Sequence, residues 1–208
     1  SVNGVEIDPR YNGFFITLPK NNLKKGTHSV SIDFKHPYSN SGSGLYRFKD
    51  PEDQRIYLYS DFEPNDASFM FPCFDQPDIK ASYTVTAEVP ASWVVVSSVR
   101  EDDVKAATAG KKSWHFPKSS VFSPYIFSLH AGEYRMWEDS AFKIPFRLFA
   151  RQSFAKYVDV KEWFLITKQG FQFYESHFDY PYPFKKYDQL IVPDFNSGAM
   201  ENVASVTF

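Results

Sequence analysis

The sequence of 208 residues is poor in cysteine, in clustered basic charge and in long apolar runs. Cys73 is the only cysteine, which excludes an internal disulfide and a cysteine-based zinc site. No Lys or Arg cluster exceeds a pair and the formal net charge is −2, so neither nucleic acid nor an anionic membrane is expected as a partner. No apolar run approaches the roughly 20 residues of a membrane span, so we predict none.

Several short signature motifs are missing as well. The chain shows no signal peptide and no Asn-x-Ser/Thr acceptor, and from these two absences we expect a cytoplasmic protein. It also has no Gly-rich phosphate loop and no Gly-x-Ser-x-Gly elbow, which argues against nucleotide binding and serine-hydrolase chemistry.

The histidines do not form a metal-binding pattern. They are His28, His36, His115, His130 and His177. No two of them stand at i and i+4, and none belongs to a His-Glu-x-x-His run, whereas a catalytic zinc site needs about three protein ligands in fixed geometry. We therefore expect surface or strand histidines, and no zinc bound by this chain.

Aromatic residues are abundant instead, at 19%, and supply ample material for a packed core. In "SVSIDFK" and "ASYTVTAEVP" apolar and polar residues alternate with period two, which is typical of half-buried antiparallel strands. Further strands are predicted at 14–18, 55–60, 93–99, 126–130 and 144–150. This part of the chain is predicted to be an all-β sandwich or a strongly curved sheet.

The period changes towards the end of the chain. From 153 to 178 apolar residues recur at steps of three, four or seven, which predicts an amphipathic helix with Ser153 as its N-cap. "YPYPF" ends the helix, and two strands, "DQLIVP" and "AMENVASVTF", follow. A second unit thus begins near residue 135. It is too small to cover the apolar stripe of its own helix, so we expect that stripe to stay half covered.

Two carboxylates are candidates for a binding site. Glu63 opens the turn in "FEPNDASFMFPCFDQPDIKASY" and is either a solvated turn residue or a side chain projecting from a strand end into a cleft. Glu201 lies in "VPDFNSGAMEN", where the small Gly198 and Ala199 permit close approach of another backbone. That segment is either an ordinary edge strand capped by a charge or an edge that accepts an extended peptide.

"GAMEN" at 198–202, following "FEPNDASFMFPCFDQPD" at a family-like distance, resembles the aminopeptidase N family of zinc metallopeptidases. The similarity covers nearly the whole chain. It implies a mainly β fold, with a saddle-shaped antiparallel β-sandwich domain at 1–135 and the first strand-helix-strand part of a thermolysin-like catalytic domain at 136–208. The family's zinc motif lies beyond "GAMEN", so the resemblance implies an amino-terminal fragment that lacks the metal site.

The resemblance also implies roles for individual residues. Family members hold the free α-ammonium of a peptide with two glutamates, which correspond to Glu63 and Glu201 here. The "GAMEN" backbone aligns the substrate as an added strand, and the residues implied are Gly198, Ala199, Met200, Glu201 and Asn202. Where the family usually has Gln, this chain has Asp61, which either strengthens ammonium binding or repels Glu63 and raises one pKa.

The function implied is that of a zinc aminopeptidase acting on peptides with a free amino terminus, the fragment itself being inactive. The alternative is a non-catalytic relative that serves as a protein-binding scaffold. A third hypothesis, a carbohydrate-binding module, depends on the aromatic content and requires exposed aromatic side chains on one sheet face.

Overall fold

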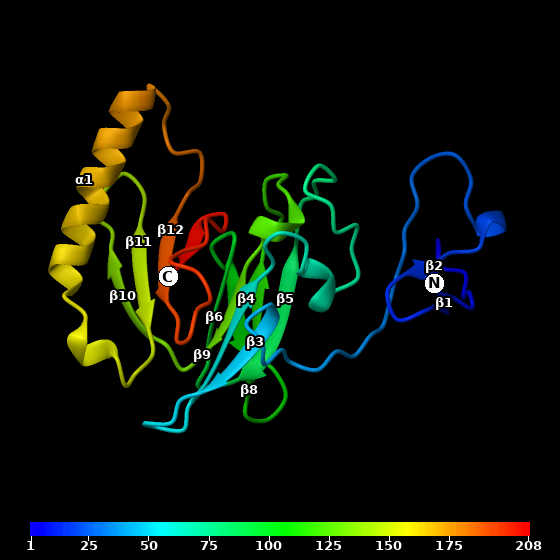
Figure 1. Ribbon diagram of the computed structural model, residues 1–208, viewed down its shortest axis with the longest axis horizontal. Helices are drawn as coiled ribbons and strands as arrows, with labels where there is room; N and C mark the ends of the chain where they lie inside the picture. The colour runs from blue at the N-terminus through cyan, green and yellow to red at the C-terminus, as the bar shows by residue number, and fades with distance from the viewer. The chain divides into compact units, whose positions relative to one another are not determined.

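The computed structural model describes all 208 residues (Figure 1), which separate into two compact units, Ser1–Pro37 and Tyr38–Phe208. No helix in either has the length and apolarity that crossing a bilayer requires.

The first unit contains little regular structure. Strands β1 (Arg10–Tyr11) and β2 (Ile16–Thr17) pair antiparallel, and one 3-10 turn, η1 (Lys20–Asn22), follows. The prediction of a half-buried strand in "SVSIDFK" is wrong, since Val30 makes only an isolated bridge to Val2 and Phe34 is 54% exposed. Alternation predicts a strand only where a neighbouring strand pairs with it, and this unit supplies none beyond that bridge.

The second unit begins with a four-stranded antiparallel sheet in the order β3-β4-β9-β6. Its strands are β3 (Gly44–Lys49), β4 (Ile56–Asp61), β6 (Val94–Ser97) and β9 (Leu129–Gly132). A three-stranded antiparallel sheet, β5-β8-β7, contains β5 (Val85–Pro90), β7 (Asp103–Ala106) and β8 (Lys111–Phe116). The alternation predicted for "ASYTVTAEVP" is confirmed, because β5 is half-buried and exposed at successive residues.

The last sheet is mixed, in the order β10-β11-β12-β13. It contains β10 (Arg135–Asp139), β11 (Phe146–Ala150), β12 (Tyr187–Ile191) and β13 (Ser205–Thr207). β10 pairs antiparallel with β11, while β11–β12 and β12–β13 are parallel. A parallel pair needs a crossover, and α1 (Val160–Phe178) supplies it between β11 and β12, lying along this sheet in Figure 1.

Helix α1 begins later than the sequence predicts. Its N-cap is Asp159, whose side chain accepts the backbone N–H of Glu162, and not Ser153. The Ser153 hydroxyl donates to the buried Asp50 carboxylate at 2.6 Å, so it is not available as a cap. The chain between Ser153 and Asp159 contains the 3-10 turn η4 (Ala155–Tyr157). The helix ends at the left-handed Asp179, two residues before the first proline of "YPYPF".

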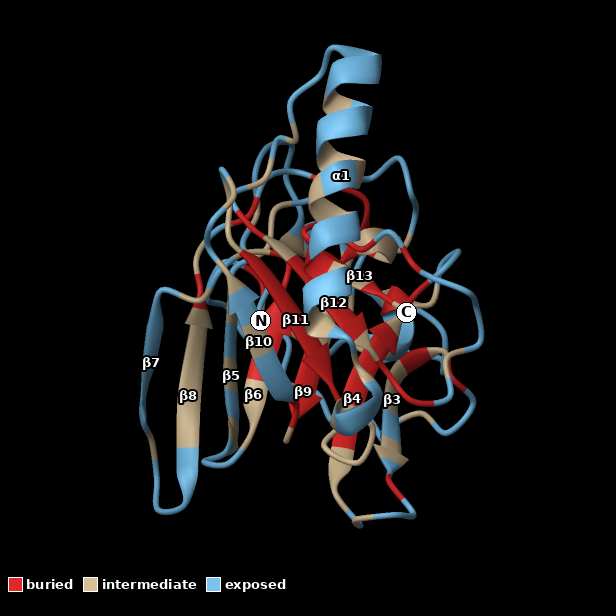
Figure 2. Cartoon of the chain, turned by 90° about the vertical axis from the view of Figure 1, so that its left-hand side faces the viewer, coloured by how far each residue is buried: buried red, intermediate tan, exposed pale blue.

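The core of the second unit lies between these layers. In Figure 2 the buried residues concentrate on β4, β9, β11 and β12. The strand aromatics Tyr57, Tyr59, Phe116, Phe146 and Phe149 are fully buried. Within this unit the burial argues against the carbohydrate-binding hypothesis, because the most exposed large aromatics of the unit lie on α1, η2 (Ala67–Phe69), η4 and loops and not on a sheet face.

The apolar stripe of α1 is covered along only part of its length, as the sequence predicts. Phe164 is buried against Phe146 and Leu148, but Tyr174 and Phe178 are 58% and 66% exposed. The structure is therefore mainly β, with several antiparallel sheets and one α-helix that its own unit does not fully cover.

Candidate functional site

Glu63 lies two residues after the end of β4. Its side chain is exposed, whereas Phe62 before it is fully buried and stacks on Phe127 with ring centroids 6.3 Å apart. The half-buried Asp61 carboxylate accepts the backbone N–H of Glu63 at 3.5 Å. Burial raises the pKa of Asp61, and the charge of Glu63 raises it further, although the hydrogen bond opposes both. Asp61 therefore shapes the turn that presents Glu63.

Glu201 lies in a tight hairpin and not in a continuous strand. Met200 and Thr207 exchange backbone hydrogen bonds of 2.9 and 3.1 Å, and the N–H of Ser205 donates to the Asn202 carbonyl. The predicted single strand in "AMENVASVTF" is therefore interrupted by a turn at 202–205, with Ala204 in a left-handed conformation at φ 57°. Met200 is buried and Glu201 is exposed, as alternation along one arm of a hairpin requires.

A short central segment, residues 126–129, runs from the end of η3 (Pro124–Ile126) into β9 and contacts both carboxylate-bearing segments. The N–H of Leu129 donates to the Ser60 hydroxyl at 2.9 Å. The N–H of Val203 donates to the Ile126 carbonyl at 3.0 Å. Phe62, Phe127 and Val203 also belong to one buried hydrophobic cluster.

Glu63 and Glu201 therefore leave the chain from segments that contact the same central segment. That their carboxylates face a common cleft stays a prediction.

The loop that leads into "GAMEN" is held by residues of β3 and β4. The Tyr59 hydroxyl donates to the carbonyls of Pro193 and Asp194, and the Tyr46 hydroxyl donates to the Asp194 carboxylate at 3.2 Å. Further along, the Asn196 side chain donates to the Ser41 carbonyl at 3.1 Å. After this anchored stretch Ser197, Gly198 and Ala199 are exposed, so the segment predicted to receive a peptide backbone is open to solvent.

Two of the residues implied by the resemblance have buried side chains. Met200 is 2% exposed, and so is Asn202. The Asn202 amide donates to the Phe127 carbonyl at 3.3 Å and its oxygen accepts the Thr207 hydroxyl at 2.9 Å. These side chains fix the hairpin, and the backbone N–H and carbonyl of Met200 are themselves paired with Thr207.

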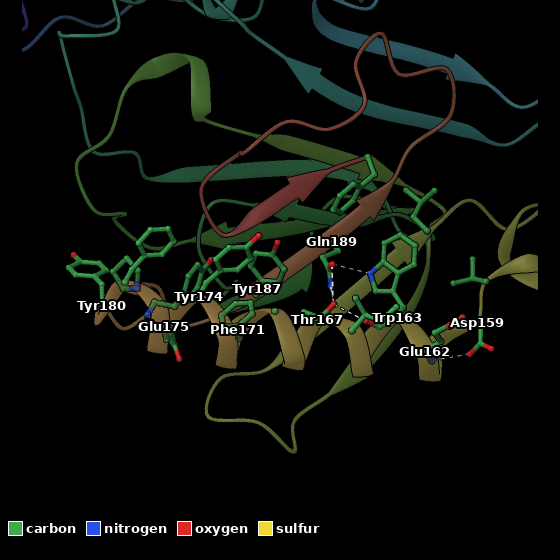
Figure 3. A pocket seen from close by; sticks show the side chains of 18 of the residues that line it. Asp159, Glu162, Trp163, Thr167, Phe171, Tyr174, Glu175, Tyr180, Tyr187 and Gln189 are labelled. Atoms are coloured by element: carbon green, nitrogen blue, oxygen red, sulfur yellow. Dashed lines mark hydrogen bonds between the residues drawn. The ribbon is translucent and has the colours of Figure 1, made fainter.

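A large cavity lies elsewhere, along α1 (Figure 3). It has a volume of about 1050 Å³ and is lined mainly by apolar and aromatic side chains. Among its polar groups, the Trp163 indole donates to Gln189 at 2.9 Å (Figure 3), and Glu175 pairs with Lys143. None of the predicted site residues lines it. This groove is the uncovered side of α1.

The zinc that the family resemblance implies does not fit the residues present. No three His, Cys, Asp or Glu side chains gather in a way that would hold a metal ion. The fully buried His130, for example, makes one 3.4 Å contact to the Thr207 hydroxyl and has no second partner. No catalytic step through a metal is therefore derived from this chain.

Sequence reasoning missed the contribution of Tyr59 and of the central segment. Both act through contacts between parts of the chain that are far apart in sequence. No local sequence pattern predicts these contacts, since a tyrosine in a strand is ordinarily a core residue.

Comparison with known proteins identifies the family. Residues 1–126 match the Peptidase M1 N-terminal domain, and residues 164–208 match the Peptidase family M1 domain. Aminopeptidase N of Streptomyces lividans is 41% identical over 196 residues, which is 92% of this chain and 22% of the relative. Aminopeptidase 2, mitochondrial, of Saccharomyces cerevisiae is 30% identical over 199 residues, 92% of this chain and 20% of the relative.

Aminopeptidase N of the dog, Canis lupus familiaris, is 28% identical over 187 residues, covering 87% of this chain and 19% of the relative. The chain thus spans about a fifth of the length of the curated relatives it matches. Both domain matches and all three relatives agree with the resemblance of the "GAMEN" and "FEPNDASFMFPCFDQPD" motifs. The chain belongs to the M1 peptidase family, also known as the aminopeptidase N family.

Proposed function

We propose that this chain is the amino-terminal portion of a zinc aminopeptidase that removes residues from the amino end of peptides. Glu63 and Glu201 anchor the free α-ammonium of the substrate, and the open backbone at Gly198 and Ala199 aligns its main chain. The observation that supports the proposal is that both glutamates are exposed and that the segments carrying them both contact the central segment.

The chemistry of the two glutamates suits this role. Neither carboxylate takes part in a salt bridge of the chain, so both are free to meet an external cation. A charge-assisted hydrogen bond from an ammonium to each would contribute about 1.5–3 kcal/mol. A peptide bond inside a chain has no ammonium, so such a pair distinguishes amino termini from internal sites. Asp61 influences this pair of glutamates because its carboxylate accepts the N–H of Glu63 and so shapes the turn that presents Glu63.

The organisation we propose follows the family. Residues 1–135 form a saddle-shaped β domain, and residues 136–208 form the first part of a thermolysin-like catalytic domain. The groove along α1 supports the second half of this proposal. An apolar surface of this size, with Tyr174 and Phe178 exposed on the helix, is typical of a face that another part of the same domain covers.

The experiment that tests this proposal measures zinc and activity together. The purified 208-residue chain is expected to hold no stoichiometric zinc and to leave aminoacyl-anilide substrates intact, because it lacks a ligand set. The natural protein that contains this chain is expected to bind one zinc per catalytic domain and to hydrolyse the same substrates. Elemental analysis and absorbance assays give both readouts.

One tightly bound zinc per 208-residue chain would refute the proposal that the zinc ligands lie outside this chain. A zinc-free, inactive natural protein would instead support the alternative, a scaffold that binds proteins through the same folds.

A further inference from the structure

A fully buried group of charges lies beneath the hairpin that carries Glu201. Lys186, just before β12, contacts the Asp188 carboxylate at 2.6 Å. Arg147 of β11 binds both oxygens of the same carboxylate, at 2.8 and 2.6 Å, and reaches Glu101 with a third bond of 2.8 Å. Lys186 is 2% exposed and Asp188 is 0% exposed. Burying an ammonium in this way is costly, and in some proteins such a group serves to specify one local conformation.

The second contact of Lys186 indicates that purpose. Its ammonium donates to the Ala204 carbonyl at 3.0 Å, and the N–H of Asp188 donates to the same oxygen at 3.0 Å. Ala204 is the third residue of the 202–205 turn and has φ 57°. That position of a turn favours glycine when φ is positive, because a Cβ makes the left-handed conformation unfavourable. The two hydrogen bonds therefore hold a residue whose own preference opposes the turn.

The turn at 202–205 determines which side chains of the hairpin face outward. Met200 pairs with Thr207 across the hairpin, which leaves Met200 buried and Glu201 exposed. In any strand pair a shift of register by one residue moves every side chain to the opposite face. A hairpin that slipped by one residue would bury Glu201 and expose Met200.

We propose that Lys186, held by Asp188, is a positioning residue that locks the left-handed turn at Ala204 and thereby fixes the outward direction of Glu201. Its importance for catalysis rests on the proposed function, whereas its effect on the turn does not. Burial lowers the pKa of Lys186 to about 8 and the Asp188 charge opposes that shift, so the lysine is mainly cationic at neutral pH.

The test uses Lys186→Met in the 208-residue chain. Methionine keeps an unbranched side chain but cannot donate to Ala204, and Asp188 keeps both bonds from Arg147. We expect amide hydrogen exchange at Met200, Ser205 and Thr207 to accelerate at least tenfold, because loss of the bond to Ala204 makes local opening of the hairpin easier. Exchange across the β5–β8 pair is expected to stay within about twofold of the unaltered chain, because local opening leaves the rest of the fold closed.

A rescue separates positioning from general stabilisation. Ala204→Gly removes the Cβ that opposes the turn, so the double variant Lys186→Met/Ala204→Gly is expected to return exchange at the three amides to within about threefold of the unaltered chain. The matched control is Lys186→Met/Gln54→Gly. Gln54 is exposed and left-handed at φ 64° in the distant β3–β4 hairpin, so relief of its strain should rescue nothing.

Three results would overturn the proposal. They are unchanged exchange in Lys186→Met, a uniform rise that includes β5–β8, and equal rescue by Gln54→Gly. If Lys186→Met alone does not fold, the double variant with Ala204→Gly is compared with Ala204→Gly alone. Equal protection at the three amides supports the proposal, while failure of the double variant to fold overturns it.

The corresponding activity test uses the natural protein that contains this chain. Lys186→Met is expected to lower kcat/KM for free-amine substrates at least tenfold. Ala204→Gly is expected to restore most of the loss and Gln54→Gly none of it, whereas an effect on stability alone would respond to both. If exchange responds as expected but Glu201→Gln leaves activity unchanged, the proposed function fails and the locking of the turn stands.

Discussion

Replacing Glu201 by Gln in the natural protein that contains this chain should lower kcat/KM for free-amine substrates roughly ten- to more than a hundred-fold. Glutamine keeps the size of the side chain and removes its charge, so about 1.5–3 kcal/mol of ammonium binding is lost. Misplacement of the scissile carbonyl adds to the loss, because the same contacts orient the reacting bond. Steady-state kinetics on aminoacyl-anilides measures the effect.

The controls for this variant are matched to its role. Zinc content should stay normal, since Glu201 belongs to no cluster of potential metal ligands. Glu63→Gln should behave alike, and the double variant should cost less than the sum because both carboxylates hold one group. An N-acetylated substrate has no ammonium, so its poor turnover should barely change. Unaltered turnover of free-amine substrates by the Glu201→Gln enzyme would make "GAMEN" an ordinary hairpin arm.

Asp188→Asn is the substitution expected to affect the stability of the chain most. The carboxylate is completely buried and neutralises Arg147 and Lys186 together. An amide of the same shape would leave two buried cations with only Glu101 nearby, and breaking a buried ion pair costs about 3–5 kcal/mol. Urea unfolding of the 208-residue chain should show a large fall in the free energy of unfolding.

The pH dependence of this loss has a definite sign. Burial alone would raise the pKa of Asp188, but Lys186 and Arg147 outweigh burial and hold that pKa below its ordinary value. A carboxyl with a lowered folded-state pKa contributes stability above its unfolded pKa and loses it as the pH falls through the folded pKa. The unaltered chain and Asp188→Asn should therefore differ most at neutral pH and converge in acid.

Glu88→Gln is the matched control for this variant. It makes the same kind of carboxylate-to-amide change in the exposed pair with Lys111, where the expected cost is below about 1 kcal/mol. Asp188→Asn costing no more than Glu88→Gln would contradict the role of the buried charges.

Local sequence patterns predicted a strand correctly where a partner strand pairs with it. The alternation of β5 is confirmed because β8 pairs with it and one face is covered. The same alternation in "SVSIDFK" failed, since periodicity cannot show whether a partner strand exists. The apolar stripe predicted α1, but not its start. Asp159 followed by Glu162 is a capping signal in the sequence, and it was a better guide than Ser153.

In the candidate site, too, local motifs predicted some residues and missed others. Glu63 and Glu201 were found through motifs, and the structure describes both as exposed side chains on segments beside one shared segment. The turn at 202–205 escaped prediction because its left-handed residue is Ala204, where a glycine would have marked it. Lys186 escaped because its purpose depends on a carbonyl that no sequence pattern points to.

The most direct test of the account is a crystal structure of the natural protein bound to a non-hydrolysable peptide analogue with a free amino terminus. The account predicts that the α-ammonium nitrogen lies within about 3.2 Å of an oxygen of Glu63 and of an oxygen of Glu201, the two carboxylates being within about 10 Å of each other. It also predicts the analogue's backbone alongside Gly198 and Ala199. Carboxylates that face opposite directions, or an ammonium held by other residues, would contradict it.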